Sequence, residues 1–450
     1  MPQVYKTKKG LDLNLKGKAE KIFIKAELAD LYAVKPLDFH LVVPKLEVKE
    51  GDVVKAGSVL FHDKGNPAIK FTSPVSGTVT SIIRGERRVI QEVEIKPTPD
   101  QKYEKFTKGD PADLDRDTII SNLLSSGLWP AVKQRPYNII ANPSDTPKSI
   151  FISAFDTAPL APDYDFLIQG SEKEFQYGVD ALSRLTAGKV HINVSDEYPA
   201  SSAFSKARNA QVNYFRGPHP AGNVGVQIHR LDPVNKGEVV WCVGPQEVVM
   251  IGRLFMNGIY DASKVVVLTG SEVVKARYYK LISGACIRSI TDHNVNEGRH
   301  RYISGNVLTG TKADPNGYIG YYDSQVTVIP EGFERELLGW AMPGFGKLSF
   351  SRTFFSWLTP RREFRVNTNM HGGHRAFVAT GIYERVLPMD IYPMQLFKAI
   401  LIEDIDLMER LGIYEVAEED FALCEFVCPS KTEIQALVRN GLDMMIKEMS

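Results

Sequence analysis

Two cysteines near the C-terminus have the spacing of metal-ligand chemistry. Cys424, Cys428 and Pro429 form the sequence C-x₃-C-P, the closing half of the run C-x₂-C-x₂-C-x₃-C-P that holds a [4Fe–4S] cluster. The same spacing places the two earlier ligands at Glu418 and Phe421, and a phenylalanine side chain cannot ligate iron. The motif is therefore degenerate, and we expect no metal site on this chain.

Two glycine-rich segments approach the spacing of nucleotide-binding loops without meeting it. Gly217–Gly225 lacks the G-x-G-x-x-G spacing, and Pro218 and Pro220 remove backbone amides that could hold phosphate. Gly344–Ser349 lacks the first glycine of a P-loop and has Leu348 where Ser or Thr would bind magnesium. We therefore predict that this chain binds no flavin or NAD(H) by itself.

The elements that must position any site begin with a β domain, expected over residues 1–100. Gly51–Leu60 and Ser73–Val79 resemble the two halves of a biotinyl/lipoyl-like hammerhead, with the hairpin tip midway between them. A carrier domain needs a lone lysine at that tip, whereas Lys64 and Lys70 only flank it. We therefore predict a structural hammerhead without the carrier lysine.

Residues 101–258 alternate between apolar strands and helices, as a parallel sheet covered on both faces requires. A capping box of Ser171 and Glu174 starts a helix that is expected to end at Gly188. Four apolar strands are expected, at 149–152, 166–168, 189–194 and 239–243. The pattern predicts a Rossmann-like α/β domain.

Three further segments complete the expected order of domains. Residues 259–330 return to a β pattern with a short helix over 272–281, which predicts a β-grasp (SLBB-like) module. Residues 331–390 are rich in glycine and aromatic residues and are expected to form a connecting region. Residues 391–450 are expected to be a helical domain with the degenerate ferredoxin motif. The fold class is therefore multidomain, with α/β and α+β parts.

The charge of the chain excludes some functions and is unevenly distributed. The 54 Lys and Arg balance the 54 Asp and Glu, which argues against nucleic acid as a partner, because phosphate binding requires a basic surplus. No window approaches the roughly 20 apolar residues of a bilayer span, and no signal-peptide core is present, so a cytoplasmic location is expected. Residues 337–375 carry six Lys and Arg and one acid, whereas residues 403–425 carry nine acids and one Arg. The two stretches either dock on each other or are solvated, or the basic aromatic stretch contacts a membrane-bound partner.

Six motifs together make the chain similar to one family. They are Gly127–Ala131 with Arg135–Tyr137, Gly217–Gly222, Ile303–Gly305, Gly339–Gly344, Gly381–Asp390 and Ala422–Pro429. Over essentially its whole length, the sequence closely resembles the A subunits of the sodium-translocating NADH:quinone oxidoreductases of bacterial membranes. One departure is Gln227, which stands where the family tends to have the first histidine of a His-x-His pair, completed here by His229.

The resemblance implies a cofactor-free subunit on the cytoplasmic face of the inner membrane, held there by the other members of a six-subunit complex. Such a complex passes electrons from NADH through FMN, riboflavin and Fe–S centres of partner subunits to ubiquinone or menaquinone, and exports Na⁺. The chain would then be part of an enzyme without being catalytic alone, and would lie near the quinone site. The alternatives are a C-subunit-like component of the related ferredoxin-linked electron-transport complex that has lost its Fe–S clusters, and a purely structural scaffold subunit.

A quinone head group requires a flat apolar slot and donors for two carbonyl oxygens. Trp129, Arg135 and Tyr137 offer two aromatic faces, a guanidinium and a phenol within nine residues. His219, on the glycine-rich loop, offers a second donor. We predict that these four residues bind the quinone. The alternative is that the aromatic side chains pack the α/β domain while Arg135 forms a surface salt bridge.

Overall fold

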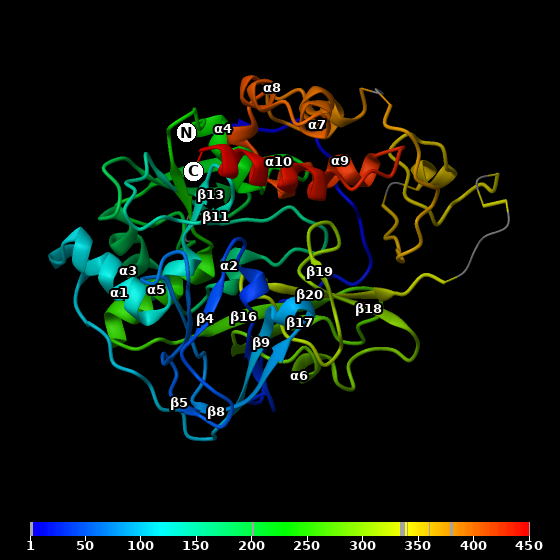
Figure 1. Cartoon of the computed structure of the whole chain (residues 1–450). Helices are drawn as coiled ribbons and strands as arrows, with labels where there is room; N and C mark the ends of the chain where they lie inside the picture. The colour runs from blue at the N-terminus through cyan, green and yellow to red at the C-terminus, as the bar shows by residue number, and fades with distance from the viewer. Residues whose placement is uncertain are drawn as a thin grey trace.

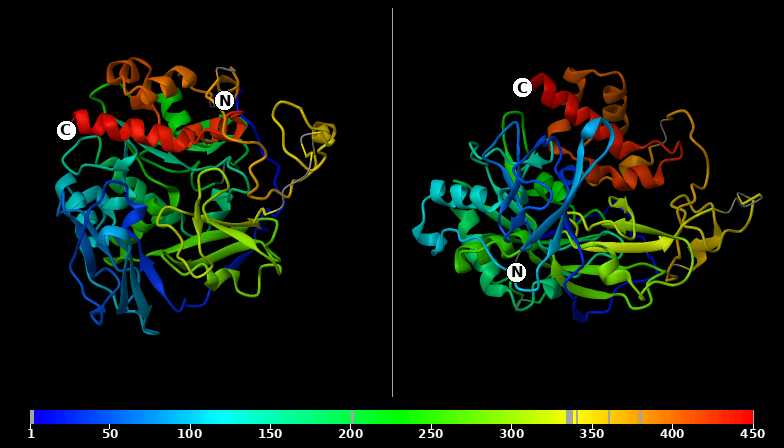
Figure 2. Two further views of the ribbon diagram at one scale, coloured as in Figure 1. Left: turned by 45° about the vertical axis from the view of Figure 1, so that its right-hand side comes forward. Right: turned by 60° about the horizontal axis from the view of Figure 1, so that its bottom comes forward.

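The structure is a computed structural model. It describes residues 3–199, 202–333, 338–339, 341–359, 361–378 and 381–449. Leu337, where the basic stretch begins, and Trp340, in one of the family-like motifs, lie outside these ranges. Helices near the C-terminus lie along one side of the molecule, above the sheets (Figure 1). The described residues of 338–378, here called the basic lobe, project from the body in all three views (Figures 1 and 2).

The N-terminal β unit consists of two small sheets, with strand orders β3-β9-β8-β5 and β4-β6-β7. The strands are β3 Tyr32–Val34, β4 Pro44–Leu46, β5 Val53–Val54, β6 Val59–Asp63, β7 Lys70–Thr72, β8 Gly77–Arg84 and β9 Ile90–Pro97. Apolar side chains such as Phe61, Val79 and Val93 are fully buried in its core. The hairpin tip lies between β6 and β7, as predicted, and Lys64 and Lys70 fall on either side of it.

The α/β unit is built on a seven-stranded sheet with the order β1-β14-β13-β12-β15-β10-β11. The strands are β1 Val4–Lys6, β10 Lys133–Arg135, β11 Ile139–Ile140, β12 Ile150–Ser153, β13 Val190–Ser195, β14 Gln211–Arg216 and β15 Val240–Cys242. The helices are α1 Arg116–Ser126, α2 Tyr164–Leu167, α3 Glu172–Ser183, α4 Val224–Leu231 and α5 Pro245–Asn257. The first five strands in this order are parallel, and β10 and β11 form an antiparallel edge. Because β13 lies on one side of β12 and β15 on the other, the strand order switches there, and such a switch point opens a crevice at the carboxyl ends of the strands.

A third unit is built on a six-stranded mixed sheet with the order β19-β18-β20-β16-β17-β2. Its elements are β2 Phe23–Lys25, β16 Ser263–Thr269, β17 Arg277–Ile282, α6 Arg288–Thr291, β18 His300–Ser304, β19 Thr311–Ala313 and β20 Gln325–Pro330. One continuous hydrophobic core joins this unit to the two before it, through side chains such as Phe61, Ile150 and Val266. The three units therefore support one another as a single body.

The C-terminal unit is helical and has its own core. Its helices are α7 Pro393–Leu401, α8 Ile405–Arg410, α9 Ala422–Val427 and α10 Ile434–Met449. Leu396, Phe397, Phe421 and Leu442 are fully buried among them. Within the described residues, no helix is long and apolar enough to cross a membrane.

Three local predictions are wrong, each for an identifiable reason. The predicted strand 166–168 lies in helix α2, because the Asp163 carboxylate accepts a hydrogen bond from the Phe166 amide and caps that helix. The predicted helix 272–281 is not helical: from Arg277 the chain forms β17, which pairs along its length with β16. The helical spacing of Pro393, Phe397, Leu401, Ile405 and Met408 predicts one helix that ends at Gly412, but the chain forms two, α7 and α8, because Asp404 caps a new helix at the Leu407 amide.

The first 25 residues do not join the N-terminal β unit, although the predicted domain spans residues 1–100. Strand β1 pairs with β14 of the seven-stranded sheet, and β2 pairs with β17 of the six-stranded sheet. The alternating Leu11, Leu13 and Leu15 form no strand, and Leu15 makes a single bridge to Phe364. The N-terminal segment thus ties several units together, a role set by long-range pairing that the local pattern does not reveal.

Candidate functional site

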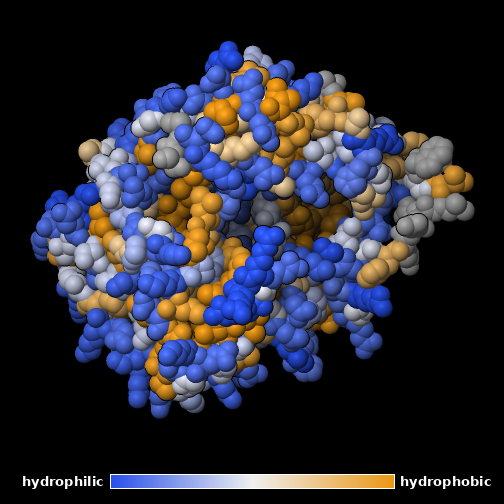
Figure 3. Space-filling view, in the orientation of Figure 1, coloured by the Kyte–Doolittle hydropathy of each residue, from blue (hydrophilic) through white to orange (hydrophobic). Residues whose placement is uncertain are grey.

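A cavity of about 240 Å³ lies at the switch point, beside the carboxyl ends of β12 and β15. Asp156 lines it just after β12, and Cys242 lines it at the end of β15. The six-stranded unit contributes Tyr322, and the C-terminal unit contributes Glu419. The face drawn in Figure 3 is hollowed near its centre, between the C-terminal helices and the sheets below them. Three units thus enclose a crevice in the position where open α/β sheets bind ligands.

His219 lines this cavity and has a buried ring nitrogen without a hydrogen-bond partner. The side chain lines the cavity, the residue is 3% exposed, and its Nε2 has no hydrogen-bond partner. Its Nδ1 lies 3.2 Å from Thr157 Oγ1, which accepts a hydrogen bond from the Gly222 amide at 2.9 Å. The Thr157 hydroxyl can therefore donate to Nδ1, which leaves the ring proton on Nε2 as a free donor. Burial lowers the pKa of His219 to about 4, so the ring is neutral at neutral pH.

The cavity does not fit a dinucleotide. Helix α5 begins at Pro245, which has no amide hydrogen, and the Glu247 carboxylate lies so close to Gly244 that a Cβ there would meet Oε2 at 2.1 Å. A carboxylate therefore stands at the helix start, where such folds hold a pyrophosphate. The volume is also below the roughly 300–1,000 Å³ of pockets for drug-sized ligands. These features suit a single uncharged ring.

Two carboxyl groups at this cavity, one buried and one partly buried, hold protons more tightly than they would in water. Burial raises the pKa of Asp156, and burial also raises the pKa of Glu247. Both residues line the cavity together with the neutral His219. The site therefore combines a hydrogen-bond donor with two acids that can deliver or accept protons.

The structure does not bring Trp129, Arg135 or Tyr137 to this cavity. Trp129 is fully buried, donates from Nε1 to the Ala141 carbonyl oxygen at 2.7 Å and packs edge-on against Trp241. Arg135 is 1% exposed and pairs with carboxylates of the C-terminal unit. Tyr137 is partly buried and lies edge-on to Tyr414, with ring centroids 6.2 Å apart. Of the four residues predicted to bind quinone, His219 alone lines the cavity.

Arg135 instead belongs to the contact between the α/β and C-terminal units. Its guanidinium lies 2.6 Å from Glu419 and 3.3 Å from Asp420, whose side chain is fully buried. Burial raises the pKa of Asp420 to about 6, although the charge of Arg135 opposes that rise. His229 pairs with Glu415, and Lys236 pairs with Glu409, each at 2.8 Å.

The acidic stretch 403–425 thus docks on the α/β unit. In the described part of the chain, none of the five arginines of the basic lobe forms an ion pair with this stretch, which does not favour docking of the two charged stretches on each other.

The degenerate cysteine motif is part of the C-terminal core. Cys424 and Cys428 are fully buried, and the Tyr383 hydroxyl lies 3.1 Å from Cys428 Sγ. At the two earlier ligand positions, Phe421 packs against Phe397, and Glu418 accepts a hydrogen bond from Asn138. No group of three or more His, Cys, Asp or Glu that could hold a metal ion occurs among the described residues. The donor set therefore does not fit an iron–sulfur cluster.

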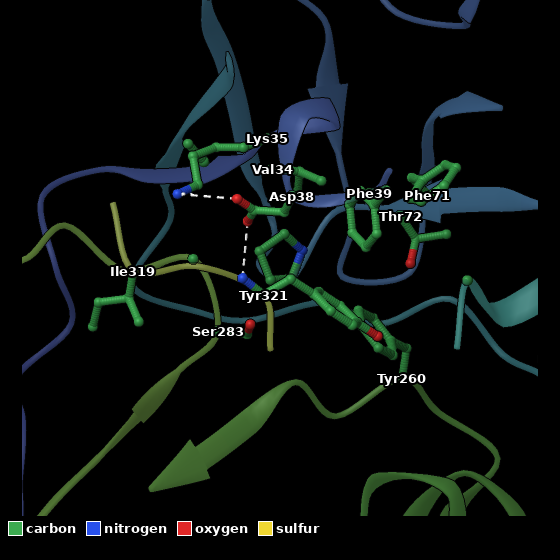
Figure 4. A pocket seen from close by; sticks show the side chains of 14 residues that line it. Val34, Lys35, Asp38, Phe39, Phe71, Thr72, Tyr260, Ser283, Ile319 and Tyr321 are labelled. Atoms are coloured by element: carbon green, nitrogen blue, oxygen red, sulfur yellow. Dashed lines mark hydrogen bonds and ion pairs between the residues drawn. The ribbon is translucent and has the colours of Figure 1, made fainter. Parts of the chain in front are cut away.

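A second, smaller cavity of about 20 Å³ lies where the β unit meets the six-stranded unit (Figure 4). Figure 4 shows Asp38 between Lys35, 3.2 Å away, and the Tyr321 amide, which donates to Asp38 at 2.8 Å. Burial raises the pKa of Asp38. The space holds about one water molecule, so it is a polar junction between units and too small for an organic ligand.

Sequence reasoning missed Asp156, Thr157 and Glu247. Their signal was positional: Asp156 and Thr157 follow the strand at 149–152, and Glu247 follows the strand at 239–243. Residues just beyond the carboxyl ends of parallel strands are candidates for a site, but the strand order that makes two such ends neighbours is not visible in one sequence.

Comparison with known families first defines the class of protein. The N-terminal barrel-sandwich hybrid domain of NqrA matches residues 5–98, its second alpha/beta domain matches residues 114–260, and the NQRA C-terminal domain, of SLBB type, matches residues 265–314. The chain is thus a multidomain α/β protein of the kind found in sodium-translocating NADH-quinone reductases.

Curated relatives match over almost the full length. The A subunit of the Na⁺-translocating NADH-quinone reductase of Pasteurella multocida (strain Pm70) is 42% identical over 444 residues, which cover 98% of this chain and 99% of the relative. The corresponding protein of Yersinia pestis bv. Antiqua (strain Angola) is 41% identical over 448 residues, with the same coverage. The chain belongs to the NqrA family, the A subunits of the Na⁺-translocating NADH-quinone reductases, and is one component of that translocating oxidoreductase complex.

Solved structures show a more distant similarity. A chain of an NAD⁺-reducing [NiFe]-hydrogenase in the air-oxidized state aligns with a TM-score of 0.39 and 12% identity, covering 74% of this chain and 61% of the other. The H₂-reduced state of an NAD⁺-reducing [NiFe]-hydrogenase gives a TM-score of 0.41, also at 12% identity.

Proposed function

We propose that this protein holds the quinone head group of the complex in the cavity beside His219. The observation that carries the proposal is the buried Nε2 of His219, a polar atom without a partner on a residue that lines a cavity of about 240 Å³. A buried donor left unpaired costs about 1–3 kcal/mol, and a quinone carbonyl oxygen would recover that loss. We assign no quinone contact to Trp129, Arg135 or Tyr137.

The chemistry of the cavity suits the conversion of quinone to quinol. The neutral Nε2–H of His219 donates to one carbonyl oxygen and stabilises the negative charge that develops there on reduction. Asp156 and Glu247, whose pKa values burial raises, are placed to supply the two protons that a quinone takes up with two electrons. The electrons come from NADH through partner subunits, because this chain offers no fit for flavin or iron–sulfur cofactors.

The proposal includes the place of the chain in the complex. The relatives are named as subunits of an Na⁺-translocating NADH-quinone reductase, and no described helix can span a bilayer. We infer that the protein is a peripheral subunit on the cytoplasmic face of the bacterial inner membrane, where the flavin-bearing membrane subunits hold it. There it supports electron transfer to ubiquinone or menaquinone, which is coupled to Na⁺ export. We also propose that the α/β unit is Rossmann-like and that the six-stranded unit is a β-grasp module.

The test replaces His219 with leucine in the assembled complex. We expect a quinone KM at least about 10-fold higher, since the lost donor is worth roughly 1–3 kcal/mol, with unchanged NADH oxidation by an artificial electron acceptor. The matched control is His293→Leu, because the side chain of His293 is 95% exposed and does not line this cavity. If His219→Leu assembles normally and keeps the parental quinone kinetics, the chain is a structural scaffold. The internal contacts of Trp129 and Arg135 already favour a structural role for their segment.

A further inference from the structure

The basic lobe exposes an unusual group of large apolar side chains. They are each about half exposed: Met342, Phe345, Phe355, Trp357, Leu358 and Met370. Single exposed apolar residues are ordinary on protein surfaces, but a cluster on one projecting element marks an interaction surface. Figure 2 shows this lobe projecting from the rest of the chain, and these six side chains remain exposed although Phe364 of the lobe packs on the body.

The same lobe carries four arginines that no acid among the described residues pairs with. Arg352, Arg361, Arg362 and Arg375 are exposed, and none forms an ion pair within the part of the chain that the structure describes. Arg365 is the exception, because it pairs with Glu272 at 2.8 Å. The acidic stretch that could have balanced the lobe is committed to the α/β unit through pairs such as Arg135 with Glu419.

A groove separates the basic lobe from the C-terminal helices. Its volume is about 1,030 Å³, several times that of the His219 cavity. Phe350 and Val366 line it from the lobe, and Phe426 and Pro429 line it from the segment that holds the degenerate cysteine motif. An apolar floor beside an unneutralised cationic surface fits a partner with apolar side chains and carboxylates.

The backbone of the lobe favours a protein partner over a lipid surface. Apart from the 3-10 turn Phe355–Leu358, its described residues are irregular, so many of its amide and carbonyl groups lack secondary-structure partners. Irregular backbone is not tolerated in contact with hydrocarbon, because those polar groups would be left unsatisfied there. A polypeptide segment can pair with them.

We propose that this groove receives an acidic, apolar segment of a membrane-bound partner subunit of the same complex. The apolar side chains of the segment pack on Phe350 and Phe426 in the groove. Its carboxylates face Arg361 and Arg362, which are exposed on the lobe outside the groove lining. The inference deepens the proposed peripheral attachment, on which it rests, by naming the surface that provides it. It is independent of the quinone cavity, which none of these residues line.

The test measures rebinding of the full-length chain to membranes that contain the complex without this protein. We expect Arg361→Glu/Arg362→Glu to weaken rebinding at least 10-fold and to reduce its salt dependence, because cation–carboxylate attraction is screened by salt. The matched control is Arg87→Glu/Arg88→Glu, which makes the same charge change on an exposed hairpin of the N-terminal β unit and should rebind as the parent does. Circular dichroism checks that each variant is folded.

A photo-crosslinking residue gives a second, direct readout. Placed at Met342, which lines the groove and is 59% exposed, it should crosslink to a membrane-embedded subunit, whereas at Val53, which is 81% exposed on the N-terminal β unit, it should not. Unchanged rebinding of the arginine variant, or no crosslink from Met342 to such a subunit, overturns the proposal. The proposal is also overturned if the chain binds protein-free phosphatidylcholine/phosphatidylglycerol vesicles through Arg361 and Arg362 while its rebinding to the complex is unchanged by their replacement. That result would identify a lipid contact. At saturating concentrations, the reassembled arginine variant should show the parental quinone KM, so a failure here is distinguishable from a failure of the His219 proposal.

Discussion

Replacing Arg135 with leucine should release the C-terminal helical unit from the α/β unit without a direct effect on quinone binding. The guanidinium is 1% exposed and contacts Glu419 at 2.6 Å and Asp420 at 3.3 Å. The Asp420 side chain is fully buried, so the variant leaves a buried carboxyl group without its cation. Removing one partner of a buried ion pair costs about 3–5 kcal/mol, far more than the loss of a surface salt bridge.

The size of this effect can be read from hydrogen exchange in helix α10, which packs in the C-terminal unit. A loss of about 3–5 kcal/mol in the free energy of local opening corresponds to exchange roughly 100- to 4,000-fold faster, if the unit opens as a whole. The double variant Arg135→Leu/Asp420→Asn should recover most of the protection, because its buried amide carries no charge and still accepts a hydrogen bond from the Ala417 amide. Arg184→Leu, at an exposed position of the α/β unit, should leave exchange in α10 unchanged.

The pH dependence of the single variant offers a further check. Arg135 lowers the pKa of Asp420 in the parent, so its removal raises that pKa above about 6 and favours the neutral carboxyl group. The loss of protection in Arg135→Leu should therefore be smaller at pH 5 than at pH 8. Unchanged exchange in α10 would refute this assignment. A raised quinone KM with full protection of α10 would instead return Arg135 to the quinone site.

Three further outcomes are expected. Burial lowers the pKa of His219 to about 4, so between pH 6.5 and 4 the unfolded chain binds a proton that the folded chain does not, and the free energy of unfolding falls as the pH falls through this window. In denaturant titrations, His219→Gln should therefore lose about 2 kcal/mol less of its free energy of unfolding than the parent between pH 7 and pH 5. An equal loss in the two proteins would contradict the assignment. The purified chain should be colourless, because Phe421 and Glu418 stand at cluster-ligand positions and Glu247 stands at the phosphate position; stoichiometric flavin or iron–sulfur bands in its visible spectrum would contradict this. Cys428→Ser should destabilise the C-terminal unit by about 1–3 kcal/mol in thermal unfolding, because a hydroxyl replaces a buried thiol, and a variant as stable as the parent would argue against a packing role.

The sequence predicted the order of the units and their types well, because capping residues, apolar periodicity and turn residues are local signals. The C-x₃-C-P segment and the hairpin tip between β6 and β7 were placed correctly for that reason. What it could not predict depends on long-range pairing: β1 and β2 leave the N-terminal unit, and residues 277–282 form a strand only because β16 lies beside them.

The same limit applies to the candidate site. Trp129, Arg135 and Tyr137 were grouped by their closeness in sequence, but β10 points its arginine toward acids about 285 residues away. His219, Asp156 and Glu247 lie in three separate segments, which the strand order of the sheet brings to one cavity. Closeness along the chain was therefore a poor guide to the site, and topology was the missing information.

The most direct measurement of the central claim is the mapping of a photoreactive quinone on the assembled complex. We predict that an azido-quinone labels peptides that line the His219 cavity, in the regions of residues 153–158, 219–224 and 242–247. Ala158 lines this cavity and is buried, so Ala158→Phe should fill the space and abolish the labelling, whereas Ala161→Phe, at a partly exposed position outside the lining, should not. Labelling that maps only to residues outside the cavity lining, or only to other proteins of the complex, or that persists in Ala158→Phe, would contradict the account.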